Sequence, residues 1–74
     1  MLVVEAVSSL DVLAELHRVL ANYDVEIRGV EVKRTDDPNR AVVEMDVKLL
    51  SESLQDQVTA QLSRTAGIQR VSWA

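Results

Sequence analysis

The chain contains no cysteine, no phenylalanine, one proline and two glycines in 74 residues. The absence of cysteine excludes a disulfide bond and a thiolate metal site. A domain of this length buries only about 60% of the surface that its unfolded chain exposes, so its core is thin. Stability must therefore come from packing the aliphatic side chains that dominate the 47% hydrophobic fraction.

Positive charge is also scarce, because eight Lys and Arg face twelve Asp and Glu and give a net charge of −4. The basic residues are scattered from Arg18 to Arg70 without interleaved aromatic residues, so we expect no nucleic-acid partner. Apolar runs such as Met1–Val4 are far shorter than the roughly 20 residues that span a bilayer. No signal-peptide pattern follows Met1. We expect no direct membrane insertion by residues 1–74.

Residues 2–7 alternate as a β-strand does, with apolar side chains on both faces, which predicts a central strand. Ser8 and Ser9 then offer an N-cap for a helix, and Asp11 adds negative charge where the helix dipole favours it. Between Asp11 and Tyr23 the apolar residues fall within one arc of the helical wheel. This periodicity predicts an amphipathic helix.

Residues 25–32 predict a second strand, with a bulge near Gly29 that returns the later side chains to the inward direction. Residues 35–40 are rich in turn formers and predict the tip of a hairpin. Residues 41–49 then alternate strictly between apolar and largely polar positions. This pattern predicts a strand with one buried and one largely hydrated face.

A second helix is predicted after residue 50, with Ser51 or Ser53 as its N-cap and Gly67 as the C′ residue that ends it. Val71 and Trp73 indicate a short last strand. The helix carries a narrow apolar stripe with i, i+4 spacing: Leu54, Val58, Leu62 and Ala66.

The resulting order βαββαβ predicts an α+β fold of the ferredoxin-like type. In this fold a four-stranded antiparallel sheet carries two helices on one face. We expect residues 1–74 to form a single domain that belongs to a longer protein.

The segments Glu5–Leu16 and Val19–Ile27 resemble the opening half of an ACT domain, a strand, a ligand loop, a helix and a second strand. Ala66–Val71 is similar to the family's usual start of the last strand, so the resemblance covers nearly the whole chain. Gly67–Trp73 resembles the end of the MgtC family, bacterial inner-membrane proteins with an ACT-like cytoplasmic tail. The MgtC resemblance implies a non-catalytic regulatory or protein-interaction domain on the cytoplasmic side of the inner membrane. The parent protein would then act in adaptation to low magnesium and in intracellular survival.

The loop after the first strand departs from the ACT pattern. Amino-acid-binding ACT domains usually carry an Asp-x-Pro-Gly-like turn there, where backbone amides receive the effector. This chain has Ser8, Ser9, Leu10 and Asp11 instead, which are weak effector-loop candidates without Pro or Gly. An amino-acid-sensing ACT domain of a soluble metabolic enzyme therefore remains the alternative to the MgtC-type domain. A gene with upstream membrane spans, or with an upstream catalytic domain, would separate the two.

No residue pattern predicts catalysis, a cofactor or a metal site. His17 is the only histidine and no nucleophile motif accompanies it, so a structural role is expected. Two carboxylate pairs, Asp36 with Asp37 and Glu44 with Asp46, lack the spacing of a calcium loop. Trp73 fits either a core anchor or a recognition residue.

The sheet face without helices is the best predicted functional surface. Side chains on it should form an apolar patch with an acidic and basic rim, and the candidates are Val3, Val7 and Val42 with Glu5, Glu44 and Lys48. Such a patch on a small domain favours docking to a protein partner or self-association, including a homodimer. The alternative is a few scattered surface valines.

Overall fold

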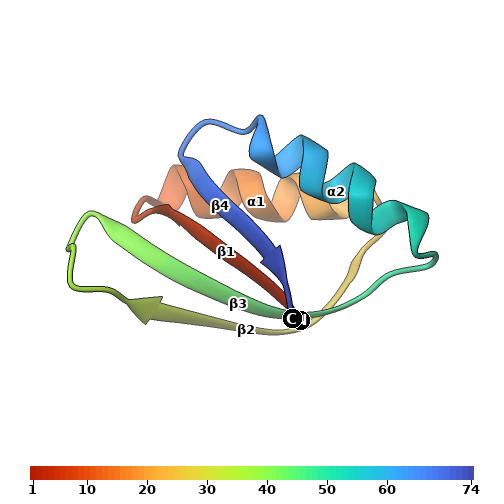
Figure 1. Ribbon diagram of the computed structural model, residues 1–74, viewed down its shortest axis with the longest axis horizontal. Coiled ribbons are helices and arrows are strands. Elements are labelled where there is room, and N and C mark those ends of the chain that lie inside the picture. Colours follow the sequence, from red (N-terminus) through yellow and green to blue (C-terminus); the bar gives the residue numbers. More distant parts are fainter.

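The computed structural model describes all 74 residues. The chain forms six helices and strands in the predicted order. The strands form one antiparallel sheet in the order β2-β3-β1-β4. Both helices lie on one side of this sheet (Figure 1), so the predicted ferredoxin-like α+β fold is confirmed. Neither helix is long and apolar enough to cross a membrane. The bounds are β1 Leu2–Val7, α1 Leu10–Asn22, β2 Glu26–Arg34, β3 Arg40–Lys48, α2 Ser53–Ser63 and β4 Ile68–Trp73.

The core lies between the sheet and the helices. β1 is central in the sheet, and its alternate residues Leu2, Val4 and Ala6 are fully buried. Burying an aliphatic side chain contributes about 1.5–3 kcal/mol, so a cluster of this size holds the layers together. The residues that meet β1 from the helices and from β3 are Leu16, Val19, Leu20, Val58, Leu62, Val43 and Met45.

The helix N-termini differ from the prediction, because no serine side chain caps either helix. Ser9 is the N-cap residue of α1, but its carbonyl oxygen accepts the bond from the Leu13 N–H at 3.1 Å. Glu52 is the N-cap residue of α2 and makes no side-chain cap bond. The Ser51 and Ser53 hydroxyls bond to each other at 2.9 Å. Solvent water can satisfy these exposed amides, which removes the need for a side-chain cap.

The end of α1 carries a stop signal that the sequence pattern did not reveal. Asp24 adopts a left-handed φ of 55°, and its N–H donates to Ala21 O at 3.1 Å. The Val25 N–H donates to Leu20 O at 3.1 Å, and the two apolar side chains share the core. These two bonds and the contact define a Schellman motif. The motif turns the chain sharply from α1 into β2.

The end of α2 corrects the prediction for Ala66 and Gly67. The helix ends at Ser63, so Ala66 lies beyond it and does not extend the apolar stripe. Gly67 is not the C′ residue but belongs to the turn before β4, where it has a φ of 88°. A β-carbon on Gly67 would lie 2.5 Å from Val12 Cγ2. Glycine is therefore required by conformation and by the close approach of α1.

The predicted bulge in β2 is confirmed, because the pairing with β3 shifts between Ile27 and Gly29. Val30 and Val32 pair with the buried residues of β3 and so occupy the helix-facing side. They remain 45% and 51% exposed nevertheless. Neither helix covers this stretch of the edge strand.

We expect Gly67→Ala to lower the free energy of unfolding by about 2–4 kcal/mol, through left-handed strain and the clash with Val12. Gly29→Ala is the matched control, because its β-carbon would meet only Asp46 Cβ at an ordinary 3.9 Å. That control should change stability by less than about 0.5 kcal/mol. Urea denaturation measures both. Equal losses for the two variants would show that the contact with Val12 does not constrain the turn.

Candidate functional site

A hollow of about 600 Å³ opens between the start of α1 and the end of α2. Its two walls come from the β1–α1 loop and the α2–β4 loop. The loops are neighbours because β1 ends where the adjacent strand β4 begins, with Ala6 opposite Ile68. One wall consists of Val7, Ser9, Asp11, Val12 and Glu15, and the other of Gln61, Arg64, Thr65, Ala66 and Gly67.

Backbone bonds fix the floor of this hollow. The Val7 N–H donates to Gly67 O at 2.8 Å and joins the two loops directly. The next amide, of Ser8, donates to Asn39 O at 2.8 Å and ties the β1–α1 loop to the hairpin tip. The amide of Ser8 is therefore already occupied and is not free to receive a ligand.

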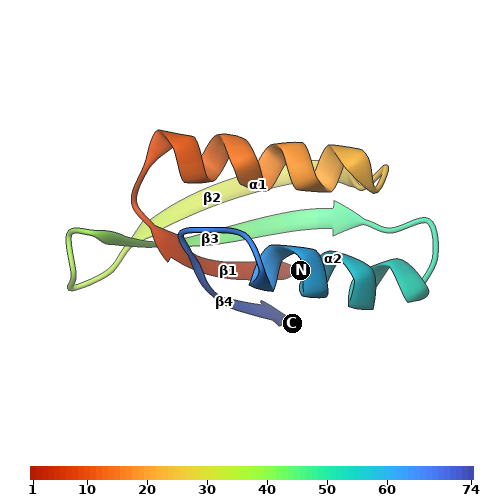
Figure 2. The ribbon, with the colours of Figure 1, turned by 90° about the horizontal axis from the view of Figure 1, so that it is seen from above.

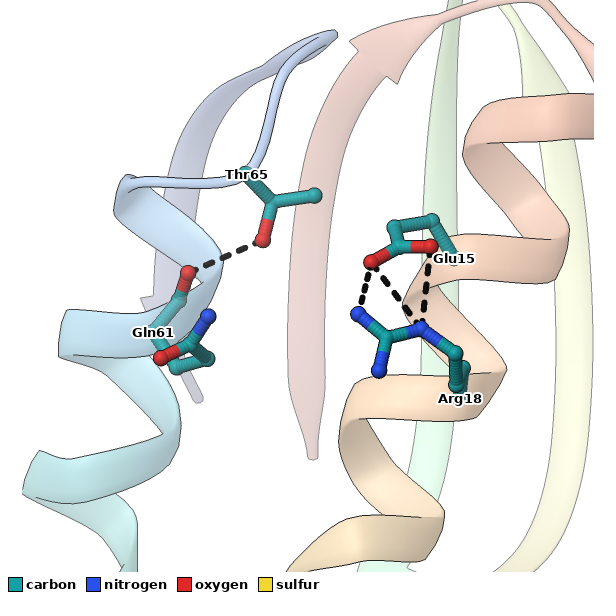
Figure 3. Close-up of polar contacts among 4 residues, drawn as sticks. All are labelled: Glu15, Arg18, Gln61 and Thr65. Atoms are coloured by element: carbon teal, nitrogen blue, oxygen red, sulfur yellow. Dashed lines mark hydrogen bonds and ion pairs between the residues drawn. The ribbon is translucent and has the colours of Figure 1, made fainter.

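Polar side chains face the space between the helices, as Figure 3 shows for Glu15 with Arg18 and for Gln61 with Thr65. The Arg18 guanidinium bonds to the Glu15 carboxylate and lowers the pKa of that carboxyl. The same bond raises the pKa of Arg18. The Thr65 hydroxyl, just after the end of α2, donates to the backbone oxygen of Gln61 at 2.9 Å. Two of the polar groups around the hollow are thus paired locally.

Most of the residues that line the hollow are polar or charged. The side chain of His17 is exposed, with Nδ1 2.9 Å from Leu13 O, and it does not line the hollow. No three His, Asp or Glu side chains converge as a metal site would require. Arg64 supplies a cation opposite the carboxylates of Asp11 and Glu15. Two of these three charges already have partners, since Glu15 pairs with Arg18 and Arg64 Nε donates to Ala60 O at 3.3 Å.

Of the four effector-loop candidates, the structure brings only Ser9 and Asp11 into the hollow. Ser8 is outside it, and Leu10 points to solvent with 84% of its surface exposed. The second wall, with Gln61, was not among the predicted site residues. The predicted fold indicates this second wall, because the βαββαβ order brings the turn before the last strand beside the loop after the first strand.

The five interface candidates lie together on the sheet face without helices. Val3 pairs with Glu44 and Glu5 with Val42, and each pair alternates with buried residues of the same strands. Val3 and Val42 are half-buried, and Val7 is 38% exposed. We call this surface, with Lys48 and Arg70, the open face.

Ion pairs cross the open face and cover part of its apolar surface. Lys33 Nζ lies 2.8 Å from Glu44 Oε2, and Arg70 Nε lies 3.8 Å from Glu5 Oε2. The pKa of Lys33 is raised, first by its bond to Glu44 and further by the charge of Glu31. Lys33 therefore stays charged at neutral pH, and it loses its proton only at a pH above the ordinary lysine range.

The remaining candidates have structural positions. Asp37 Oδ1 accepts the Asn39 N–H at 2.9 Å and closes the hairpin turn. Asp46 is exposed on β3. Trp73 donates its indole N–H to Thr59 Oγ1 at 2.7 Å and packs against the core. Of the two interpretations of Trp73, the structure favours an anchor that joins β4 to α2.

No protein-family model and no curated protein matches the chain. Among the 21 chains of solved structures that match it, two are an ACT domain and an MgtC C-terminal domain, both less than 25% identical to this chain. The ACT domain of GTP pyrophosphokinase from Chlorobium tepidum superposes with a TM-score of 0.78 at 11% identity, covering 96% of this chain and 90% of that one. The C-terminal domain of the MgtC protein from Mycobacterium tuberculosis superposes with a TM-score of 0.74 at 18% identity, covering 99% of this chain and 81% of that one. The chain has the ACT-like fold.

We expect the pKa of the Glu15 carboxyl to lie below its ordinary value of 4.5, because Arg18 stabilises the charged form. The pair therefore favours the folded state at neutral pH, and this contribution is lost as the pH falls through the lowered pKa. Carbon-detected NMR titration of the side-chain carboxyls measures the value. Arg18→Met should raise it. An unchanged midpoint in Arg18→Met would contradict the pairing.

Proposed function

We propose that this chain is a non-catalytic regulatory domain of an MgtC-type membrane protein and acts by contact with another protein surface. The surface that it contacts belongs to the membrane part of the same protein, a second copy or a partner. In this proposal the domain lies on the cytoplasmic side of the bacterial inner membrane, and its parent protein serves adaptation to low magnesium and intracellular survival.

The likeness to the MgtC C-terminal domain carries the proposal. It extends over 99% of this chain and 81% of that one. The resemblance of Gly67–Trp73 to the end of the MgtC family adds a sequence observation to the shared fold. The hollow lacks a converging metal-ligand set, which favours a contact function over magnesium binding.

The open face is the contact surface in this proposal. Its valines are covered by no helix, and Glu44 and Glu5 already have basic partners on the same face. A docking protein would therefore meet an apolar centre with its charges largely neutralised, which lowers the cost of removing water.

The position of the termini agrees with a membrane-tethered domain. The Met1 amine donates to Ala74 O at 3.0 Å, and the Ala74 N–H donates to Met1 O at 2.9 Å. Figure 2 shows the two ends near each other, on the side of the sheet where α2 lies. Since β1 begins at Leu2 and ends at Val7 beside the hollow, the termini lie at the end of the strand opposite the hollow. A segment joined to Met1 would leave the hollow and the hairpin tip unobstructed.

One observation favours the alternative, an amino-acid-binding ACT domain of a soluble enzyme. The hollow adjoins the β1–α1 loop and combines Arg64 with two carboxylates. A zwitterionic amino acid needs both charges. The occupied amide of Ser8 and the absent Pro-Gly turn argue against this function.

Replacing Val3 and Val7 together by Lys should weaken docking of the 74-residue chain to its protein partner without unfolding the chain. Each buried valine contributes about 1.5 kcal/mol, so loss of both weakens binding roughly 100-fold. The first probe is the purified membrane part encoded upstream in the same gene, and calorimetric titration gives the affinity.

The matched control replaces Leu10 and Leu50 by Lys, which adds the same charge at exposed apolar positions off the open face. This control should bind as the parent does. A gene that encodes a soluble catalytic domain upstream instead of membrane spans would contradict the MgtC-type proposal. Loss of the helical circular dichroism in the Val3 and Val7 variant would show that these valines belong to the core.

We further expect neither free amino acids nor millimolar Mg²⁺ to bind at a defined site. NMR titration of the labelled chain tests both. Saturable shifts confined to residues 8–12 and the facing turn would support the amino-acid alternative. Saturable shifts around Asp36 and Asp37, or around Glu44 and Asp46, would overturn the expectation for Mg²⁺.

A further inference from the structure

A second, smaller hollow of about 270 Å³ lies on the open face, away from the hollow between the helices. Glu44 pairs with Val3 on that face, and across β3 it pairs with Glu31, while Asp46 pairs with Gly29. Paired residues share a face of the sheet, and so do residues two apart in a strand. A β-carbon on Gly29 would meet only Asp46 Cβ, at 3.9 Å. The missing side chain of Gly29 therefore leaves the floor of this hollow open.

The charged side chains that line this smaller hollow are all carboxylates, those of Glu31, Glu44 and Asp46. Glu31 lies directly opposite Glu44, an unfavourable pair of like charges. Lys33 pairs with Glu44, and Glu5 at the apolar centre pairs with a basic residue as well. Glu31 and Asp46 take part in no ion pair. A cation from another molecule would neutralise these two carboxylates and relieve the repulsion.

The geometry favours a cationic side chain over a metal ion. The three carboxylates do not converge as the ligands of a metal ion must. An Arg or Lys side chain is long and carries several N–H donors, so it can contact carboxylates that stand apart along two strands. The space over Gly29 lets such a side chain lie against the strand backbone.

The position of the smaller hollow indicates where this cation comes from. Met1 forms part of its wall, so the hollow lies at the end of β1 to which the membrane part is joined in the proposed function. Cytoplasmic loops of membrane proteins carry an excess of Lys and Arg. The tether holds these loops near the hollow at a high effective concentration. A second copy is a poorer occupant, because its net charge of −4 repels this acidic surface.

We propose that the hollow over Gly29 receives a Lys or Arg side chain from a cytoplasmic loop of the membrane part of the same protein. This inference rests on the proposed function and adds the chemistry of the partner. The cation lies among Glu31, Glu44 and Asp46, and apolar residues beside it on the loop meet Val3, the neighbour of Glu44 on β1. The ionic contact determines where the loop docks, whereas the apolar contact supplies affinity.

Removal of two carboxylates tests the ionic contact. Glu31→Gln combined with Asp46→Asn should weaken binding of the purified membrane part about tenfold in calorimetric titration. The matched control is Asp36→Asn with Asp56→Asn, which removes the same charge from exposed positions off the open face that take part in no ion pair. This control should bind within about twofold of the parent. Added salt should weaken binding of the parent more than binding of the Glu31 and Asp46 variant.

Filling the hollow tests the same contact without any change of charge. Gly29→Val should weaken binding about tenfold, because its side chain occupies the space of the incoming cation. Gly29→Ala fills less of that space and should have a smaller effect. Valine suits a strand and meets no close neighbour at this position, so the variant should keep the circular dichroism of the parent.

A charge exchange identifies the cation. Each Lys and Arg in the cytoplasmic loops of the membrane part is replaced by Glu in turn. One of these variants should bind the parent chain about tenfold more weakly and should recover affinity for Asp46→Lys, which restores opposite charges.

Three results would overturn the inference. The first is unchanged binding of the filled and the neutralised variants while the Val3 and Val7 variant binds weakly. Docking through the open face would then stand, and only the ionic contact would fail. The second is no binding between the folded parent and the membrane part, which rejects this occupant and leaves a second copy or another protein for the proposed function. The third is a charge exchange in which no loop variant recovers affinity.

Discussion

Burial of one face of β1 under both helices is the constraint on which the rest of this structure depends. Leu2, Val4 and Ala6 are the central contacts of a core that has no cysteine or metal to support it. Because β1 lies between β3 and β4, the same six residues also order the sheet. Alternation then requires Val3, Glu5 and Val7 to face away from the helices. The alternation of side chains along β1 therefore produces both the central core contacts and the open face.

The same constraint creates the hollow. Two loops meet where β1 ends and β4 begins, and the contact of Gly67 with Val12 sets how closely they approach. A side chain on Gly67 would separate the α2–β4 turn from α1 or distort it. The size of the hollow is therefore determined by backbone packing, whereas its charge depends on Asp11, Glu15 and Arg64. Shape and charge can change independently there.

Periodicity predicted the elements, because apolar spacing reflects burial directly. Periodicity also located the bulge at Gly29, and the alternation of side chains along β1 and β3 located the open face. It failed at the helix ends: solvent replaces the expected serine caps, and Asp24 stops α1 where no glycine signals a stop. It also missed the second wall of the hollow, since Gln61 and Arg64 are ordinary helix-surface residues by pattern. Their role depends on which loops become neighbours, and that is a property of the topology.

The uncovered half of β2 follows from the small size of the domain. Two short helices cannot cover four strands, and the strand farthest from the buried centre, β2, keeps Val30 and Val32 in contact with water. Proteins usually protect such an edge with charge. Here Glu31, Lys33 and Arg34 provide it, since all three charged side chains are exposed on β2. The charged side chains of β2 therefore disfavour unselective pairing along its outer edge, where the exposed Val30 and Val32 would otherwise favour it.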